Sequence, residues 1–228
     1  MTSPSPLLFD TYYHIYNRGT NGENIFIQER NFEYFLKLYE KHITPVADTF
    51  AYCMLRNHFH IAVRIKSEEE IVKTLKVSSS NQNRVKQDNP ASPDESRSGK
   101  PLGSIIPESY VSQKFSNFFN AYAKSINIAY SRTGSLFEHP FGRVPITDDR
   151  QFWTVIAYIH QNPQKHNFVK DFRDWKYSSY GVIFSTKHTI IKRNKVMEWF
   201  GNKEDYLSLH NDWVADAQSK WFAGDDYD

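Results

Sequence analysis

Residues 51–65 read AYCMLRNHFHIAVRI, and this stretch decides the fold. Apolar and β-favouring residues fill positions 49–55 and 58–65, and the pair Arg56-Asn57 separates the two runs. That spacing is typical of antiparallel strands joined by a tight turn. The sequence therefore predicts a β-hairpin whose second strand is apolar enough to lie inside a sheet.

Periodic patterns on both sides of the hairpin predict further elements. Residues 12–18 alternate between two sets of side chains, which indicates a strand, and apolar residues at three- and four-residue steps predict a helix over 28–43. After the hairpin, Ser67 and Glu70 have the spacing of a capping box. We therefore expect a helix over 67–76.

The second half of the chain adds helices and one interrupted apolar run. A helix is predicted over 111–132, and another over 148–162 that ends before Pro163. Pro140 interrupts residues 135–146, so a strand there is short or at an edge. This order predicts an α+β sandwich in which helices cover one side of an antiparallel sheet.

Two regions are expected to lie outside that sandwich. Residues 78–104 contain too few apolar side chains to form a core, so we expect a flexible, disordered insertion there. We expect one domain over 1–180 and a C-terminal helical extension over 181–228, with an amphipathic stretch around 196–213.

Composition narrows the class of protein. The single cysteine, Cys53, cannot form an internal bridge, which fits a reducing compartment, and no window has the ~20 apolar residues needed to span a bilayer. We therefore expect a cytoplasmic protein without a membrane partner. Because Lys and Arg number 28 against 26 Asp and Glu, an anionic partner must be argued from local patches rather than from net charge.

His58 and His60 form a His-x-His pair on the second hairpin strand. Residues at i and i+2 of a strand project from the same face about 7 Å apart, close enough for two imidazoles to bind one metal ion. A bare pair of this kind is often only packed or solvated. Here the flanking strand is apolar, so unpartnered imidazoles would be costly, and we favour a functional pair facing a cleft.

Tyr158 and Asn162 lie one turn apart on the helix before Pro163, so a phenol and an amide share one helix face. Taken alone, the two residues would be interpreted as a buried tyrosine and a helix cap. Three other tyrosines, Tyr13, Tyr16 and Tyr130, could serve equally as nucleophiles on chemical grounds.

Several blocks together resemble the REP-associated tyrosine transposases, which are relatives of the single-tyrosine transposases of the HUH (His-hydrophobic-His) superfamily. The matching blocks are YHIYNRG at 13–19, MLRNHFHIAV at 54–63, GSLFEHPFGR at 134–143, AYIHQNPQKH at 157–166 and DWKYSSY at 174–180. They occur in the family's order and span about residues 12–180.

The resemblance implies a ferredoxin-like core and assigns roles within it. It makes His58 and His60 metal ligands and Tyr158 the nucleophile, and it places Asn162 where relatives have a third, polar ligand. Two imidazoles and an amide leave positions for water and phosphate oxygens, which suits Mg²⁺ or Mn²⁺. The implied reaction cleaves and rejoins single-stranded or hairpin DNA through a 5′-phosphotyrosine and a free 3′-OH.

Cations near the matching blocks could contact phosphates, or they could simply be solvated charges. The candidates are Arg18, Arg56, Lys114, Lys124, Arg143, Arg150, Lys165 and His166. The oligomeric state, monomer or homodimer, stays open, and a DNA-bound form would be nucleoid-associated.

Two other functions remain as alternatives. The first is a domesticated hairpin- or REP-like DNA-binding protein without transposition activity, although the intact His58, His60 and Tyr158 argue against catalytic decay. The second is a histidine-triad nucleotide hydrolase, but that motif needs a third histidine where this chain has Ala62.

Overall fold

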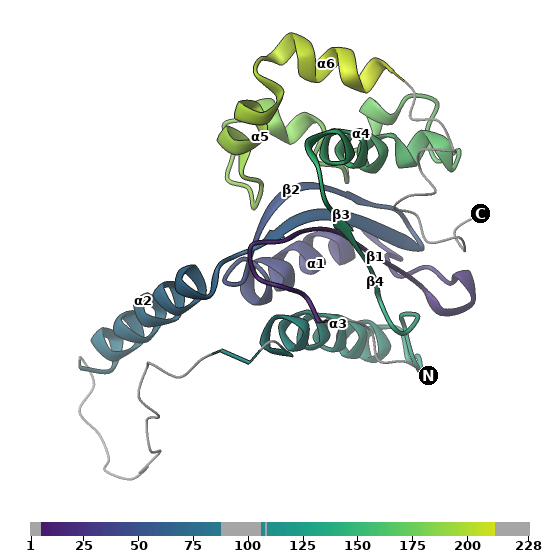
Figure 1. The fold of residues 1–228 in the computed structure, drawn as a ribbon. Helices are drawn as coiled ribbons and strands as arrows, with labels where there is room; N and C mark the ends of the chain where they lie inside the picture. The colour runs from purple at the N-terminus through teal and green to yellow at the C-terminus, as the bar shows by residue number, and fades with distance from the viewer. Residues whose placement is uncertain (1–5, 88–105, 108, 213–228) are drawn as a thin grey trace.

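The computed structural model describes residues 6–87, 106–107 and 109–212, in which four antiparallel strands form a central sheet. They are β1 (Tyr12–Arg18), β2 (Ala47–Met54), β3 (His58–Ile65) and β4 (Gly142–Ile146), in the order β2-β3-β1-β4. Between them lie α1 (Glu29–His42), after β1, and α2 (Glu68–Gln87) and α3 (Ser109–Ala129), after β3. This topology confirms the α+β, ferredoxin-like sandwich, with β4 as the predicted short edge strand (Figure 1).

Helices cover both faces of the sheet, which corrects the expectation of one covered side. Helices α1 and α3 lie against one face, and α4 (Asp149–Lys165) lies across the other (Figure 1). Every residue of β2 is buried, as a strand between two helical layers requires. The expected single cover came from the order of the elements, which does not show that α4 lies across the face of β1 and β3 that carries His14 and His60.

The layer formed by α1, α3 and the lower face of the sheet is the aromatic core. The ring of Phe59 lies 5.0 Å from Phe35 of α1 and 5.8 Å from Phe119 of α3. Phe35 also contacts Phe118 at 4.7 Å between ring centroids. Burying each such side chain contributes about 1.5–3 kcal/mol, so this layer supplies much of the fold's stability.

Helix α4 continues through Pro163 to Lys165, which corrects the predicted end before that proline. Proline has no N–H to donate to the carbonyl four residues earlier, so inside a helix it removes one hydrogen bond. In the last turn the loss is confined to that bond, and His166 N still donates to Asn162 O at 3.0 Å. The helix begins as predicted, because Asp148 Oδ1 accepts a hydrogen bond from Gln151 N at 2.8 Å.

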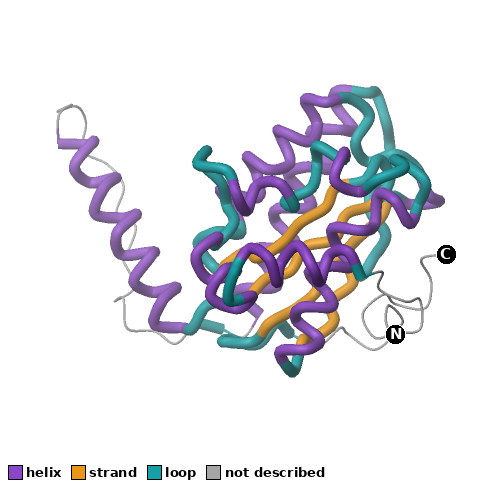
Figure 2. The backbone as a smooth tube through the Cα atoms, turned by 90° about the horizontal axis from the view of Figure 1, so that it is seen from above, coloured by secondary structure: helices purple, strands orange, loops and turns teal. Residues whose placement is uncertain are grey.

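Helix α2 starts with the predicted capping box. Glu70 N donates to Ser67 Oγ at 3.1 Å, and Ser67 N donates to Glu70 Oε2 at 2.9 Å. The helix then runs to Gln87, so the first residues of the insertion expected over 78–104 are helical, and 88–105 lie outside the described residues. A helix that is already nucleated can extend through polar residues, and α2 projects away from the sheet (Figures 1 and 2). No helix in the described ranges is long and apolar enough to cross a membrane.

The C-terminal part packs on α4 and along the edge of β2. Short 3-10 turns, η2 (Phe172–Asp174) and η3 (Gly181–Phe184), lead to α5 (Arg193–Phe200) and α6 (Lys203–Asn211). A left-handed residue, Gly201 at φ 79°, separates these two helices, so the amphipathic stretch predicted around 196–213 is not one continuous helix. The division of the chain at residue 180 stays a prediction.

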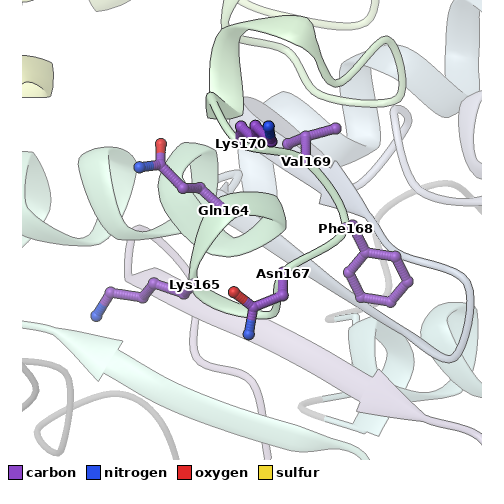
Figure 3. A pocket seen from close by; sticks show the side chains of 6 residues that line it. All are labelled: Gln164, Lys165, Asn167, Phe168, Val169 and Lys170. Carbon is purple, nitrogen blue, oxygen red and sulfur yellow. The ribbon is translucent and has the colours of Figure 1, made fainter.

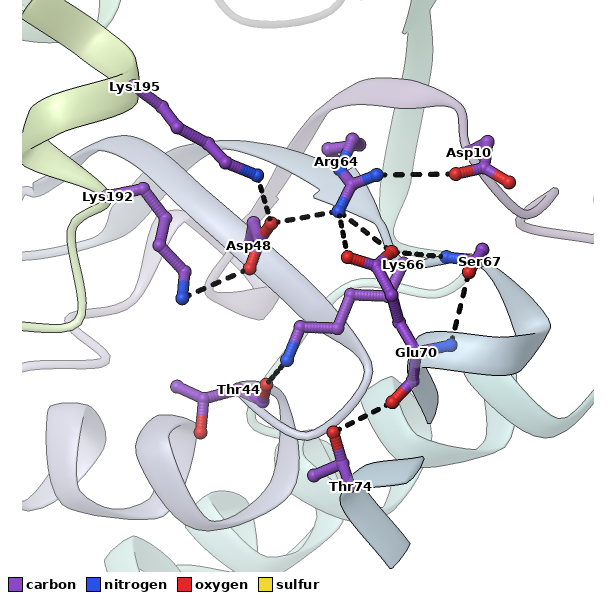
Figure 4. Close-up of polar contacts among 10 residues, drawn as sticks. All are labelled: Asp10, Thr44, Asp48, Arg64, Lys66, Ser67, Glu70, Thr74, Lys192 and Lys195. Atoms are coloured by element: carbon purple, nitrogen blue, oxygen red, sulfur yellow. Dashed lines mark hydrogen bonds and ion pairs between the residues drawn. The ribbon is translucent and has the colours of Figure 1, made fainter. Parts of the chain in front are cut away.

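A buried carboxylate joins the sheet to the C-terminal part (Figure 4). Asp48 Oδ2 of β2 lies 3.0 Å from Arg64 and 3.2 Å from Lys195, and its Oδ1 lies 3.3 Å from Lys192. Arg64 also binds Glu70 of α2 at 2.8 Å. Burial alone would raise the pKa of Asp48, but the hydrogen bond from Arg64 and the two lysine charges bring that pKa below its usual value.

Candidate active site between the sheet and helix α4

His58 and His60 project from the same face of β3, toward α4. Their ring centroids are 5.2 Å apart, and the rings are nearly perpendicular at 87°. Both side chains are buried, while Phe59 between them points into the aromatic core. The strand alternation of β3 therefore puts two imidazoles on one side and an apolar anchor on the other.

Helix α4 brings Tyr158 to the two histidines. The Tyr158 ring lies 5.6 Å from the His60 ring, almost perpendicular to it. One turn later, Asn162 Nδ2 donates to Tyr158 O at 2.8 Å. This bond fixes the orientation of the amide, and Asn162 Oδ1 is buried without a hydrogen-bond partner among the residues that the structure describes.

Burial keeps the two imidazoles neutral. Burial, followed by the nearby His166 and Arg18, lowers the pKa of His58 to about 3. The pKa of His60 is also well below its usual value, because of burial first and then neighbouring histidines. A neutral imidazole has a lone pair for a metal ion, so both side chains are in the protonation state that a ligand requires.

Hydrogen bonds hold each imidazole at one ring nitrogen. His58 Nδ1 lies 2.8 Å from Asn57 Oδ1, an atom that can only accept, so Nδ1 donates and the lone pair is on Nε2. Within the described part of the chain, His58 Nε2 is buried and has no hydrogen-bond partner. The His60 ring is held at Nδ1, which lies 3.0 Å from His14 Nε2.

These residues fit a metal ion that completes its shell with water. No three His, Cys, Asp or Glu side chains of the described ranges are arranged to hold a metal. The fitting set is instead two imidazoles, His58 and His60, with the amide oxygen of Asn162. Buried polar atoms ordinarily have a partner, so His58 Nε2 and Asn162 Oδ1 are atoms that a cation would satisfy.

Two further histidines lie beside this set, and sequence reasoning missed the place of both. The His166 ring is 4.8 Å from the His58 ring, whereas its place in the sequence indicates only a candidate DNA-contacting cation. The sequence pattern places His14 only on a strand, and in the structure its ring stacks 5.1 Å from that of His60. The alternation of residues 12–18 put His14 on one face, but only the pairing register shows which face that is.

The cations expected to contact DNA are divided between the two faces of the sheet. Arg18 lies near His58 and forms an ion pair with Glu138 at 2.7 Å, and Lys165 Nζ lies 5.1 Å from the centre of the Tyr158 ring. Arg56 is exposed in the turn between β2 and β3, and Arg150 is in the first turn of α4. The remaining three are not at the site: Lys114 and Lys124 on α3, and Arg143 of β4, which faces Ser112 of α3.

A hollow lies at the C-terminal end of α4, and one of its lining residues, Lys165, also lies over the Tyr158 ring. Its lining is Gln164, Lys165, Asn167, Phe168, Val169 and Lys170. Lys165 and Asn167 project to the same side, toward the sheet (Figure 3). Two lysines and two amides make this hollow suitable for an anionic chain that approaches the tyrosine.

Comparison with known proteins supports the fold. No family model and no curated protein matches the chain. A solved structure does match it, described as a REP-associated tyrosine transposase bound to a REP hairpin, with a TM-score of 0.51. The two chains are 13% identical, and the match covers 83% of this chain and 89% of the other. The resemblance noted in the sequence therefore holds at the level of the fold, which this chain shares with that transposase.

Proposed function

We propose that this chain is a metal-dependent enzyme that cleaves single-stranded DNA at hairpin-forming ends and rejoins it through a 5′-phosphotyrosine at Tyr158. The observation that carries the proposal is the convergence of a phenol and two neutral imidazoles between β3 and α4. A purely structural cluster would have no need for the buried Nε2 of His58 and Oδ1 of Asn162, neither of which has a hydrogen-bond partner among the described residues.

In this mechanism Tyr158 supplies the nucleophile. Its oxygen forms a bond to the scissile phosphorus, the bond from phosphorus to the 3′-oxygen breaks, and that oxygen takes up a proton to become a 3′-OH. The phenol proton passes to solvent water before or during attack, solvent returns a proton to the leaving 3′-oxygen, and the positive charge of Lys165 beside the ring stabilises the phenolate. Rejoining is the reverse displacement by a 3′-OH.

His58, His60 and Asn162 would hold the divalent ion, Mg²⁺ or Mn²⁺. When bound, such an ion polarises the phosphate and stabilises charge on its oxygens. The chain's own contribution is to hold two imidazoles neutral by burial and to aim the Asn162 oxygen outward from its helix. Arg18 and Lys165 then offer positive charge on the same side of the sheet.

Hairpin DNA is the proposed partner because the solved structure with this fold is bound to a REP hairpin. The lysines of the hollow at the end of α4 support the same class of ligand: Lys165 ends the helix with its Nζ 5.1 Å from the centre of the Tyr158 ring, and Lys170 lies in the segment that follows. Phosphate contacts of this kind position a strand without reading its sequence.

Covalent capture tests the proposal. The probe is a hairpin oligonucleotide with randomised single-stranded flanks and a fluorophore at its 3′ end, incubated with the protein and Mn²⁺. Attack by a tyrosine at a 5′-phosphate leaves the 3′-labelled fragment on the protein, so we expect a labelled band that survives denaturation. The tryptic peptide 151–165 contains Tyr158 as its single tyrosine, so mass spectrometry can identify the adduct without ambiguity.

Two variants make the result specific. Tyr158→Phe should give no adduct, whereas Tyr16→Phe should still give one. Tyr16 is the matched control because it lies on the same sheet face, with its ring 6.0 Å from His60, whereas the Tyr130 hydroxyl donates to Asn31 and Tyr13 Oη accepts from Leu8 N. Binding of the hairpin without any adduct in Mn²⁺ would instead favour a DNA-binding protein without catalysis.

A further inference from the structure

His14 is a buried histidine that the proposed reaction does not use. It lies on β1 opposite Ala62 of β3, on the face that α4 covers. His14 Nε2 is 3.0 Å from His60 Nδ1, and the two rings are stacked at an interplanar angle of 18°. A hydrogen bond between two ring nitrogens in a buried setting restricts where the protons of both rings can lie.

Two neutral imidazoles joined in this way share one proton between the facing nitrogens. If His14 donates that proton, His60 must hold its own proton on Nε2, which then has no lone pair for a cation. If His60 donates from Nδ1, then His60 Nε2 has the lone pair and His14 must hold its proton on Nδ1. Only the second arrangement allows His60 to bind a metal through Nε2.

We propose that His14 is a positioning residue that accepts a hydrogen bond from His60 Nδ1 and so presents the lone pair of His60 Nε2 to the metal. This inference rests on the proposed function, because it assigns His60 the ligand role. His14 cannot itself be the ligand through Nε2, since that atom is directed at His60 Nδ1. Partners of ligating histidines usually set the tautomer and the ring orientation in this manner.

The two proposed imidazole ligands are thus fixed by different acceptors. His58 is set by the amide oxygen of its chain neighbour Asn57, and His60 by an imidazole from another strand. An amide oxygen has one role only, whereas an imidazole can accept or donate according to its own tautomer. The tautomer and orientation of His60 therefore depend on a side chain of another strand, β1, whereas those of His58 depend on a residue of the turn just before β3.

Metal binding by three variants tests this inference, with calorimetric titration of Mn²⁺ as the readout. His14→Phe keeps a buried ring but removes the acceptor, so we expect Mn²⁺ affinity to fall by about 10–100-fold. His14→Gln restores an accepting oxygen and should bind within about threefold of the wild type if the acceptor is what matters. Tyr12→Phe is the control, because it changes an aromatic residue on the same face of the same strand.

A second measurement needs no variant. Two-bond proton–nitrogen correlation spectra of the metal-free protein report which ring nitrogen of each histidine has the proton. We expect both His14 and His60 to be protonated at Nδ1. Protonation of His60 at Nε2 would overturn the inference, as would wild-type Mn²⁺ affinity in His14→Phe or a failure of His14→Gln to recover binding.

The same titration separates this inference from the function on which it rests. If the wild type binds no Mn²⁺, or if His60→Ala binds as tightly as the wild type, the proposed metal site itself is wrong. If His60→Ala loses binding while folded His14→Phe retains it, the site stands and only the role of His14 is withdrawn. Urea denaturation of each variant shows whether it is folded. Where a variant is not folded, the proton–nitrogen spectra of the metal-free wild type decide whether His14 accepts the hydrogen bond from His60.

Discussion

The two faces of strand β3 differ in what their side chains contact. On one face, Phe59 packs against aromatic rings of α1 and α3, including Phe35 at 5.0 Å. On the other, His58 and His60 face Tyr158 of α4, with ring nitrogens that hydrogen-bond to specific partners. Because alternate residues of one strand serve both layers, changes one position apart should separate stability from chemistry.

The largest expected effect lies on the histidine face. Tyr158→Phe removes one hydroxyl and no packing volume, so we expect complete loss of covalent DNA capture with stability and hairpin affinity close to those of the wild type. Gel analysis of the 3′-labelled adduct measures the first property, and urea denaturation and a binding titration measure the others. Adduct formation at the wild-type rate would move the nucleophile to another tyrosine.

The opposite face should show the reverse effect. Phe59→Ala removes a fully buried ring, and we expect the free energy of unfolding to fall by about 3–5 kcal/mol. The neighbouring His58→Ala removes a ring whose Nε2 has no described partner, so its cost should be clearly smaller. Urea denaturation of both variants checks the difference. Equal losses would show that the histidine face contributes to stability as much as the aromatic core does.

Acid should weaken the layer beside α4 rather than the aromatic core. Burial, only partly offset by the bond to Tyr206 O, lowers the pKa of His210 to about 4, and this ring also contacts His160 at 2.8 Å. Between pH 6.5 and 4 the unfolded chain binds more protons at His210, so stability falls as the pH falls, by up to about 3 kcal/mol from this group.

A paired variant isolates that contribution. In His210→Gln the titrating ring is absent, so unfolding free energies measured from pH 7.5 to 5 should decline less steeply than in the wild type, by up to about 1.4 kcal/mol per pH unit. His139→Gln is the control, because it removes a histidine that is exposed on the surface and should leave the slope nearly unchanged. A wild-type slope in His210→Gln would contradict the assignment.

The smallest expected effect concerns the amide of the proposed site. Water can replace a neutral amide oxygen at a hard cation, so Asn162→Ala should weaken Mn²⁺ binding by about tenfold or less, or roughly 1.4 kcal/mol. His60→Ala should weaken it more, because an orienting imidazole is lost. Parallel Mn²⁺ titrations against cleavage of a hairpin probe compare the two. If the order is reversed, Asn162 rather than His60 is the principal ligand.

Local patterns predicted much of this architecture. The capping box of Ser67 and Glu70 formed as expected, because it involves atoms within one turn. The shared face of His58 and His60 followed from strand alternation alone, and the short edge strand followed from proline. Each of these features depends on residues that are close in sequence.

Other features depend on contacts that sequence spacing does not contain. The helical cover on the second face could not be read from β1 and β3, because histidine and tyrosine are compatible with either a surface or a cleft. The neighbour relation of His14 and His60 needs the register of two strands 46 residues apart. The roles of the site residues, Tyr158 above all, remain predictions that the experiments above address.

One edge of β2 is covered by residues that the ribosome adds much later than β2 itself, and this has a consequence for synthesis. The edge of β2 is covered from downstream, since Met54 N donates to Tyr177 O and Lys192 N donates to Thr49 O. At roughly 5–20 residues per second, the 147 residues from Asp48 to Lys195 take about 7–30 s to make. During that interval the strand presents an open edge to other chains, so we expect slow translation to increase aggregation. This effect can be measured by comparing the soluble yield of two versions of the gene, in which residues 60–190 are encoded by fast or by slow codons.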